Sequence, residues 1–192
     1  MDWRYAEAVP PDAYNKSALL SLPELSAKVG FSLVLPTYLP SGISPYFRDD
    51  VGQAAGTPGL EAQITLLPAE DSGAPSISFY ERPANPDSPA TDLCDPQDCA
   101  STQIGGIDVA CRVIIPTPGA TFNPPPPPTA TPPETNPRLR CSWENSQLGF
   151  LTEFGWLLKE PIPGYVSPEM RAEAMKVVTS MIEDPYVLGP GS

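Results

Sequence analysis

The chain has 192 residues, of which 41% are hydrophobic, with 11 Lys and Arg against 23 Asp and Glu, no His, and a net charge of −12. This length suits one domain with a substantial core. The acidic balance argues against a nucleic acid or an anionic membrane surface as partner, because binding to phosphate groups needs clustered cations. The absence of histidine excludes the Ser-His and Cys-His nucleophile pairs of many hydrolases.

Residues 1–17 are polar, interrupted by proline and dotted with aromatic residues, which predicts an extended N-terminal arm. Met1-Asp2-Trp3 resembles an added start, and no stretch reaches the roughly 18 to 20 apolar residues of a membrane span. Two interpretations are open: a cytosolic protein, or an extracytoplasmic one whose membrane anchor or signal peptide is missing from this sequence. The cysteines and a long proline tract favour the second.

The next stretch predicts a short helix followed directly by an apolar strand. Ser21 and Glu24 have the spacing of a capping box at the helix start. Gly30 stands where a helix commonly ends in a left-handed residue. Residues 31–35 are then expected to form an apolar strand with Phe31, Leu33 and Leu35 on one side, and it stops at Pro36, which cannot donate a hydrogen bond to a sheet. A helix of two to three turns is not stable alone, so we expect it to pack on the rest of the domain.

Alternation of apolar and polar residues predicts most of the sheet. Two loops are expected between these strands, a mobile one at 49–59 and a longer one at 85–102, and residues 187–192 are expected to form a disordered tail. The expected strands are 44–48, 60–66, 77–80, 107–115, 139–143 and 148–158.

The four cysteines divide into two pairs by their surroundings. Cys111 and Cys141 both point to the apolar side of their predicted strands, so a disulfide would join those strands if they pair. Cys94 and Cys99 are close in sequence, and a small disulfide would staple their loop. Four cysteines allow three connectivities, and reduced, simply buried Cys111 and Cys141 remain the alternative.

The loop around the first cysteine pair also contains Asp92, Asp95 and Asp98. A metal site is one interpretation, but the loop lacks the glycine and spacing of a calcium loop, and the chain lacks histidine for a zinc set. We therefore predict no metal there. Residues 116–137 are rich in proline and predict a projecting polyproline II loop. A ligand for a proline-reading groove is the alternative to a solvated insertion.

The predicted strand at 148–158 is strongly aromatic on one face, where Phe150, Phe154 and Trp156 alternate. The last predicted helix begins at the Ser167 cap and ends before Pro185, and its apolar face is suited to cover these aromatic residues. The sequence thus predicts an α+β fold over 18–186: a single antiparallel sheet of about six strands, with an N-terminal and a C-terminal helix packed on one face.

Several sequence motifs of the chain resemble those of a known family. The pattern G-F-x-L-x-L-P-x-Y-L-P-x-G from Gly30 to Gly42, the Gly-Gly-Ile of Gly105 to Ile107, a strand with Trp143 and a final helix resemble the bacterial extracytoplasmic domain of unknown function 4367. The resemblance implies the outer part of a membrane-tethered protein, in some members associated with anti-sigma-type regulators or with lipoproteins similar to the LolA carrier class. The proline tract and the cysteines near residue 95 depart from the family pattern.

No stretch has the pattern of a catalytic or cofactor site. There is no glycine-rich phosphate loop, and the carboxylate pairs Asp49-Asp50 and Glu70-Asp71 lie in predicted loops without an apolar setting. We expect no enzyme and no cofactor. The predicted function is that of a non-catalytic extracytoplasmic sensing or partner-binding domain, tethered to a bacterial membrane, with an unidentified protein as partner. The alternative is a carrier of a hydrophobic ligand such as a lipid, for which Phe150, Phe154 and Trp156 form the ligand face.

Overall fold

The structure, a computed structural model, describes residues 3, 6–8, 20–52, 59–69, 72–85, 99–114, 136–156 and 165–190. The elements in chain order are β1 (Glu7–Ala8), α1 (Leu22–Val29), β2 (Leu33–Leu35), β3 (Ile43–Gly52), β4 (Glu61–Pro68), β5 (Ser76–Pro83), β6 (Ala100–Ile104), β7 (Ile107–Ile114), β8 (Arg138–Glu144), β9 (Leu148–Gly155), α2 (Pro168–Glu183) and β10 (Tyr186–Leu188). Every second residue of β4 and β5 is buried up to the last two positions, because their sequences alternate between apolar and polar residues.

The fold is built on an open eight-stranded sheet with the order β1-β3-β4-β5-β9-β8-β7-β6, and β10 pairs with β2 in a second, two-stranded sheet. All neighbouring strands are antiparallel except β1 and β3. The predicted α+β fold with an antiparallel sheet is confirmed in this coarse form. The prediction of a single sheet of about six strands is wrong, since the larger sheet has eight strands and β2 and β10 form a second sheet.

The elements that the sequence did not predict are short, polar or both. β6 is paired with β7 through its backbone while four of its five residues are exposed, so it has no apolar alternation to reveal it. The loop predicted at 85–102 is therefore wrong from Ala100 onward. The loop predicted at 49–59 is likewise wrong as far as Gly52, because Asp49 and Asp50 continue the β3–β4 ladder. The tail predicted from residue 187 is wrong as far as Leu188, since β10 extends to that residue.

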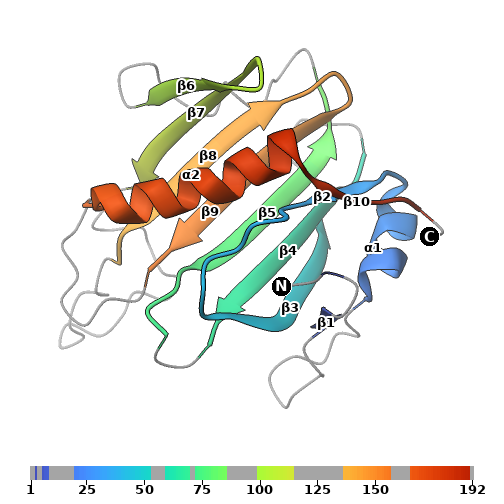
Figure 1. Ribbon diagram of the computed structural model, residues 1–192. Helices are drawn as coiled ribbons and strands as arrows, with labels where there is room; N and C mark the ends of the chain where they lie inside the picture. The colour runs from blue at the N-terminus through green and yellow to red at the C-terminus, as the bar shows by residue number, and fades with distance from the viewer. Residues whose placement is uncertain are drawn as a thin grey trace, which may run out of the picture.

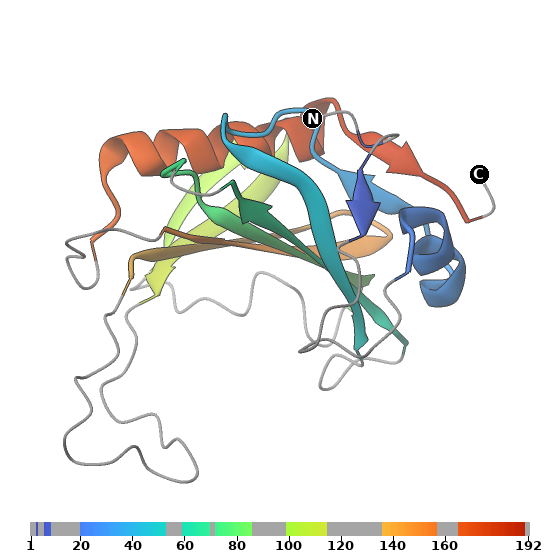
Figure 2. The same ribbon diagram turned by 90° about the horizontal axis from the view of Figure 1, so that it is seen from below.

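One face of the larger sheet is covered by a second layer. Figure 1 shows α2 lying diagonally across this face, with the β2–β10 ribbon continuing the same layer towards α1. Seen edge-on in Figure 2, α2 and the ribbon lie on one side of the sheet, and α1 lies at its end. The contacts of α1 are with β3, β4 and β10. The core therefore lies between the sheet and this layer.

α1 begins and ends as its sequence predicts. The backbone N–H of Ser21 donates to the Glu24 carboxylate over 2.8 Å, which satisfies one of the amides that a helix start leaves unpaired. Gly30 has φ of 80° and donates its N–H to the carbonyl of Ser26. The chain can then reverse into β2 within a few residues.

We predict that Gly30→Ala lowers the free energy of unfolding by about 1 kcal/mol, because an alanine side chain is strained at positive φ. An added Cβ at Gly30 would meet nothing within 4 Å, so the expected loss comes from the backbone alone. Gly52→Ala is the matched control, since that glycine also has open space and has no positive φ. Urea unfolding of both variants measures the difference, and equal stabilities would contradict the prediction.

The core contains the N-terminal Trp3 as well as residues of the predicted strands. The Trp3 side chain is 5% exposed, donates its indole N–H to the carbonyl of Pro36 over 2.6 Å and packs edge-on against Phe79. The helix α2 contributes a further part of the core. Its buried residues are Ala174, Val177, Val178 and Met181.

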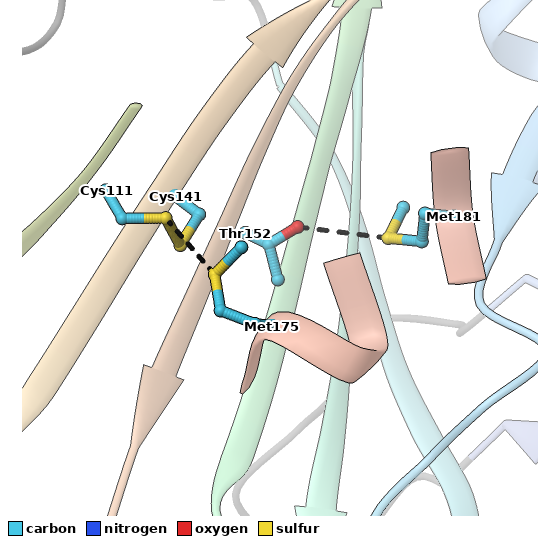
Figure 3. Close-up of a disulfide and its surroundings, with 5 residues drawn as sticks. All are labelled: Cys111, Cys141, Thr152, Met175 and Met181. Atoms are coloured by element: carbon cyan, nitrogen blue, oxygen red, sulfur yellow. Dashed lines mark hydrogen bonds between the residues drawn. A yellow bond between two sulfur atoms is a disulfide. The ribbon is translucent and has the colours of Figure 1, made fainter. Parts of the chain in front are cut away.

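A disulfide joins Cys111 in β7 to Cys141 in β8, as the sequence predicts. The two residues are directly opposite each other in the ladder and are 4% and 0% exposed. Figure 3 shows Met175 and Met181 reaching from α2 to the sheet, Met175 towards the disulfide and Met181 towards Thr152. A buried disulfide indicates an oxidising, extracytoplasmic environment. Among the helices of the described residues, none has the length and apolar character needed to cross a membrane.

Cys99 is also disulfide-bonded. Its predicted partner Cys94 lies outside the described residues, and so do Asp92, Asp95, Asp98 and the proline tract from 116 to 135. The small disulfide therefore stays a prediction.

Candidate functional site

An apolar groove of about 520 Å³ opens where the second layer meets the end of the sheet. Four segments form its walls: the turn from α1 into β2, the β8–β9 hairpin, the C-terminal end of α2 with β10, and single residues of β5 and β7. The lining residues are Val29, Gly30, Phe31, Ser32, Val34, Pro83, Ile107, Trp143, Asn145, Gln147, Leu148, Phe150, Met181, Ile182, Pro185 and Val187.

Local hydrogen bonds hold two of these walls in place. In the β8–β9 hairpin, the Asn145 side-chain oxygen accepts the N–H of Gln147 over 2.9 Å and that of Leu148 over 2.7 Å, which fixes the turn. Opposite the hairpin, the Ser26 hydroxyl donates to the carbonyl of Phe31 over 2.7 Å. The side chains of Leu148 and Phe31 are thereby presented from two rigid turns.

The floor of the groove contains an aromatic pair. Trp143 and Phe150 are cross-strand partners and stack with ring centroids 5.2 Å apart. Met181 borders them from α2. On the outer side, Val187 is 56% exposed and is paired with Val34. Apolar residues therefore extend from the buried floor of the groove to its exposed rim.

None of the lining residues among the described part of the chain is ionisable, although 18% of the chain is Asp, Glu, Lys or Arg. Its polar side chains are the uncharged Ser32, Asn145 and Gln147. An apolar groove with a few neutral polar groups is the usual composition of a site for a small molecule. A charged ligand would lose part of its hydration in the groove and would find no opposite charge in the lining to compensate for it.

A buried carboxyl lies directly behind the groove wall. Glu81 is 1% exposed and stands opposite Phe150 in the β5–β9 register. Its Oε2 accepts the N–H of Val34 over 3.0 Å, while its Oε1 is buried without a hydrogen-bond partner among the described residues. Burial raises the pKa of Glu81 to about 8, against the smaller opposing effect of the Val34 hydrogen bond. The side chain is therefore protonated at neutral pH.

The structure separates the three aromatic residues that the sequence places on one ligand face. Phe150 lines the groove. Phe154 is 0% exposed and stacks on Trp156 with ring centroids 6.1 Å apart, and neither is among the groove-lining residues described. Sequence reasoning missed Leu148 and Val187 as lining residues, since the first belongs to a hairpin end and the second to the unpredicted β10.

The opposite face of the sheet is polar. Glu153 accepts hydrogen bonds from Arg138 over 3.1 Å and from Arg140 over 2.8 Å. Two shallow hollows of about 230 and 390 Å³ lie on this face and share Tyr80. Burial raises the pKa of the Tyr80 hydroxyl, and the nearby carboxylate of Glu153 adds to this effect.

The carboxylate pairs considered from the sequence do not form a site in the described residues. Asp49 and Asp50 lie in strand β3 rather than in a loop, so that expectation is wrong. Asp49 accepts the N–H of Leu20 over 3.1 Å, and burial is the main reason that its pKa is raised. Glu70 and Asp71 lie outside the described residues. Within those residues, no group of three or more His, Cys, Asp or Glu is placed to hold a metal ion.

These features define an α+β domain in which a helix and a two-stranded ribbon cover one face of an open sheet and leave an apolar groove at one end. No family model matches the chain, and none of the curated proteins matches it. A solved structure from Bacteroides thetaiotaomicron is similar to 85% of this chain and 50% of that one, with a TM-score of 0.42 and 13% sequence identity. The chain thus spans about half the length of that protein, and the likeness is too low to assign a fold or a function.

Proposed function

We propose that this domain is a non-catalytic extracytoplasmic binding module and that it takes an uncharged, apolar ligand into the groove between α2, β10 and the β8–β9 hairpin. The observation that supports the proposal is the groove itself. A volume of about 520 Å³ falls within the roughly 300 to 1,000 Å³ that is typical of small-molecule sites. The ligand would pack against the Trp143–Phe150 pair.

Two features favour a ligand over an incompletely filled core. Met181 of α2 contacts Thr152, and Phe154 is fully buried, so among the described residues the aromatic face of β9 is packed at these positions and the groove lies at one end of the sheet. At that end, the exposed apolar side chain of Val187 forms part of the lining. Apolar residues that continue from the core to the surface are typical of a binding groove.

Replacing Val187 with glutamate is expected to weaken the binding of an apolar probe at least about tenfold, because the probe would then have to desolvate a carboxylate. Phenylnaphthylamine is a suitable probe, since it is uncharged and its fluorescence rises in apolar surroundings. The substitution is expected to leave the fold intact because Val187 is largely exposed. Fluorescence titration of the wild-type and variant proteins measures the effect.

Leu60→Glu is the matched control for this experiment. Leu60 is another exposed apolar residue, at 38%, and it does not line the groove. The control adds the same charge, so it is expected to bind the probe as the wild type does. Equal binding by all three proteins would place the probe elsewhere, and the absence of binding to the wild type would contradict the proposal. Native mass spectrometry of the purified protein would also detect a retained lipid.

We further propose that the domain acts at the cell surface or in secreted form, tethered to a bacterial membrane as the resemblance to the domain of unknown function 4367 implies. The buried Cys111–Cys141 disulfide supports the compartment. The short helix, the Gly30 turn and β2 have the order of the motif on which the resemblance rests. Membership of that family remains part of the proposal.

A second candidate function is the binding of a protein partner on the polar face of the sheet, as expected for a sensing domain. Five of the chain's 11 basic residues occupy this face, together with five acidic residues (Asp50, Glu61, Asp108, Glu144 and Glu153), so this face is close to neutral in a protein with a net charge of −12. Failure of any apolar probe to bind would make this the better supported function. The five residues are Arg48, Arg82, Arg112, Arg138 and Arg140.

A further inference from the structure

Three neighbours of the buried residue Glu81 also line the groove. Val34 lines the groove and donates its backbone N–H to Oε2 of Glu81 over 3.0 Å. Phe150 lines the groove and is the cross-strand neighbour of Glu81 in the ladder. Pro83, two residues further along β5, lies on the same side of that strand and also lines the groove. One hydrogen-bond partner of Glu81, one cross-strand neighbour and one residue on the same side of its strand therefore all line the groove.

The hydrogen bonding of this carboxyl is incomplete. Oε2 is satisfied by Val34, but Oε1 is buried and has no partner in the part of the chain that is described. No charged side chain among those residues contributes to the pKa of Glu81, which burial raises to about 8. Below that pH the proton belongs on Oε1, since Oε2 already accepts the amide hydrogen. Oε1–H is then a buried donor that needs an acceptor.

We infer that the ligand is a neutral amphiphile whose apolar chain lies in the groove and whose head carries an oxygen acceptor, such as an ester carbonyl, that enters between Val34 and Phe150 and accepts a hydrogen bond from Oε1–H of Glu81. This inference rests on the proposed function, because it names the ligand class of the same groove. A pure hydrocarbon would fill the groove and leave the donor unsatisfied. A cationic or anionic head would have no counter-charge in the groove lining.

The test compares two competitors of equal chain length, methyl octanoate and decane, by their displacement of bound phenylnaphthylamine. The ester is expected to displace the dye at roughly tenfold lower concentration than the alkane when the pH is well below 8, because it alone can accept the hydrogen bond. When the pH is well above 8, Glu81 loses its proton and the advantage of the ester is expected to disappear. Circular dichroism at both pH values checks that the domain stays folded.

Glu81→Gln distinguishes this role from a purely structural one. The glutamine amide accepts the Val34 N–H through its oxygen and keeps an N–H donor at every pH, so the advantage of the ester is expected to persist in alkaline solution. Equal displacement by the two competitors below pH 8 would overturn the inference while leaving the groove as a site for apolar ligands. Failure of the dye to bind the wild-type protein would overturn both.

Discussion

Glu81→Gln is expected to make the domain markedly more stable in alkaline solution and to leave its stability in mild acid nearly unchanged. The reason is the difference in proton binding between the folded and unfolded states. In the folded protein, burial raises the pKa of Glu81 from its ordinary value of 4.5 to about 8. Between these two values the folded state holds a proton that the unfolded state has released.

The sign of the effect follows from this difference. The free energy of unfolding falls as the pH rises from 4.5, because proton release then favours the unfolded chain, and the fall ends once Glu81 ionises in the folded state near pH 8. The total loss is on the order of 5 kcal/mol. Glutamine has nearly the same shape, carries no charge and can still accept the Val34 N–H, so this loss should be absent from the variant.

Urea unfolding of both proteins across this pH interval measures the difference in slope. Glu183→Gln is the control, since it removes the same charge from an exposed residue of α2 and should unfold like the wild type. Parallel pH profiles for the wild type and Glu81→Gln would contradict the prediction. That result would mean that Glu81 is solvated or paired in the folded protein.

Removing the disulfide between β7 and β8, by Cys111→Ala together with Cys141→Ala, is expected to lower the free energy of unfolding by roughly 4 kcal/mol in the chain-entropy model. The bridge spans a sequence separation of 30 residues. Without the bridge, the unfolded chain regains the freedom of this long segment.

The matched control is removal of the other two cysteines, Cys94→Ala with Cys99→Ala. Because the predicted ring is much shorter, the expected loss is only roughly 2 kcal/mol. Thiol titration of the native, unreduced wild-type protein should find no reactive sulfhydryl. Reduction of the wild-type protein should lower its stability at least to that of the variant that lacks Cys111 and Cys141. Reactive thiols in the native protein, or a larger loss from the control pair, would contradict these expectations.

The sequence predicted those elements whose capping residues or apolar periodicity can be recognised locally. α1 was recognisable from Ser21, Glu24 and Gly30, and α2 from its apolar face. The pairing of Cys111 with Cys141 could be anticipated because both cysteines belong to alternating strands on either side of one long loop. The strands β1, β6 and β10 could not be predicted, because they are short and are stabilised by pairing with other strands.

The candidate site was less accessible to sequence reasoning than the fold. The aromatic ribbon of β9 was recognised, yet its members have different roles: Phe150 lines the groove while Phe154 is core. The position of Glu81 could have been found, because Ile77, Phe79 and Glu81 alternate in one strand and the third must share the apolar side of the first two. Its burial beneath Val34 depends on a segment 47 residues away.

The sequence by itself therefore determined the class of fold and the two helices, because local periodicity and capping depend on neighbours along the chain, and it made Cys111–Cys141 one of the expected cysteine pairs. Only the tertiary structure decided where the groove lies and which carboxyl is buried behind it. The groove is assembled from the α1–β2 turn, the β8–β9 hairpin and the chain after α2. The gap between such distant segments depends on how their side chains pack together, and no local pattern contains that information.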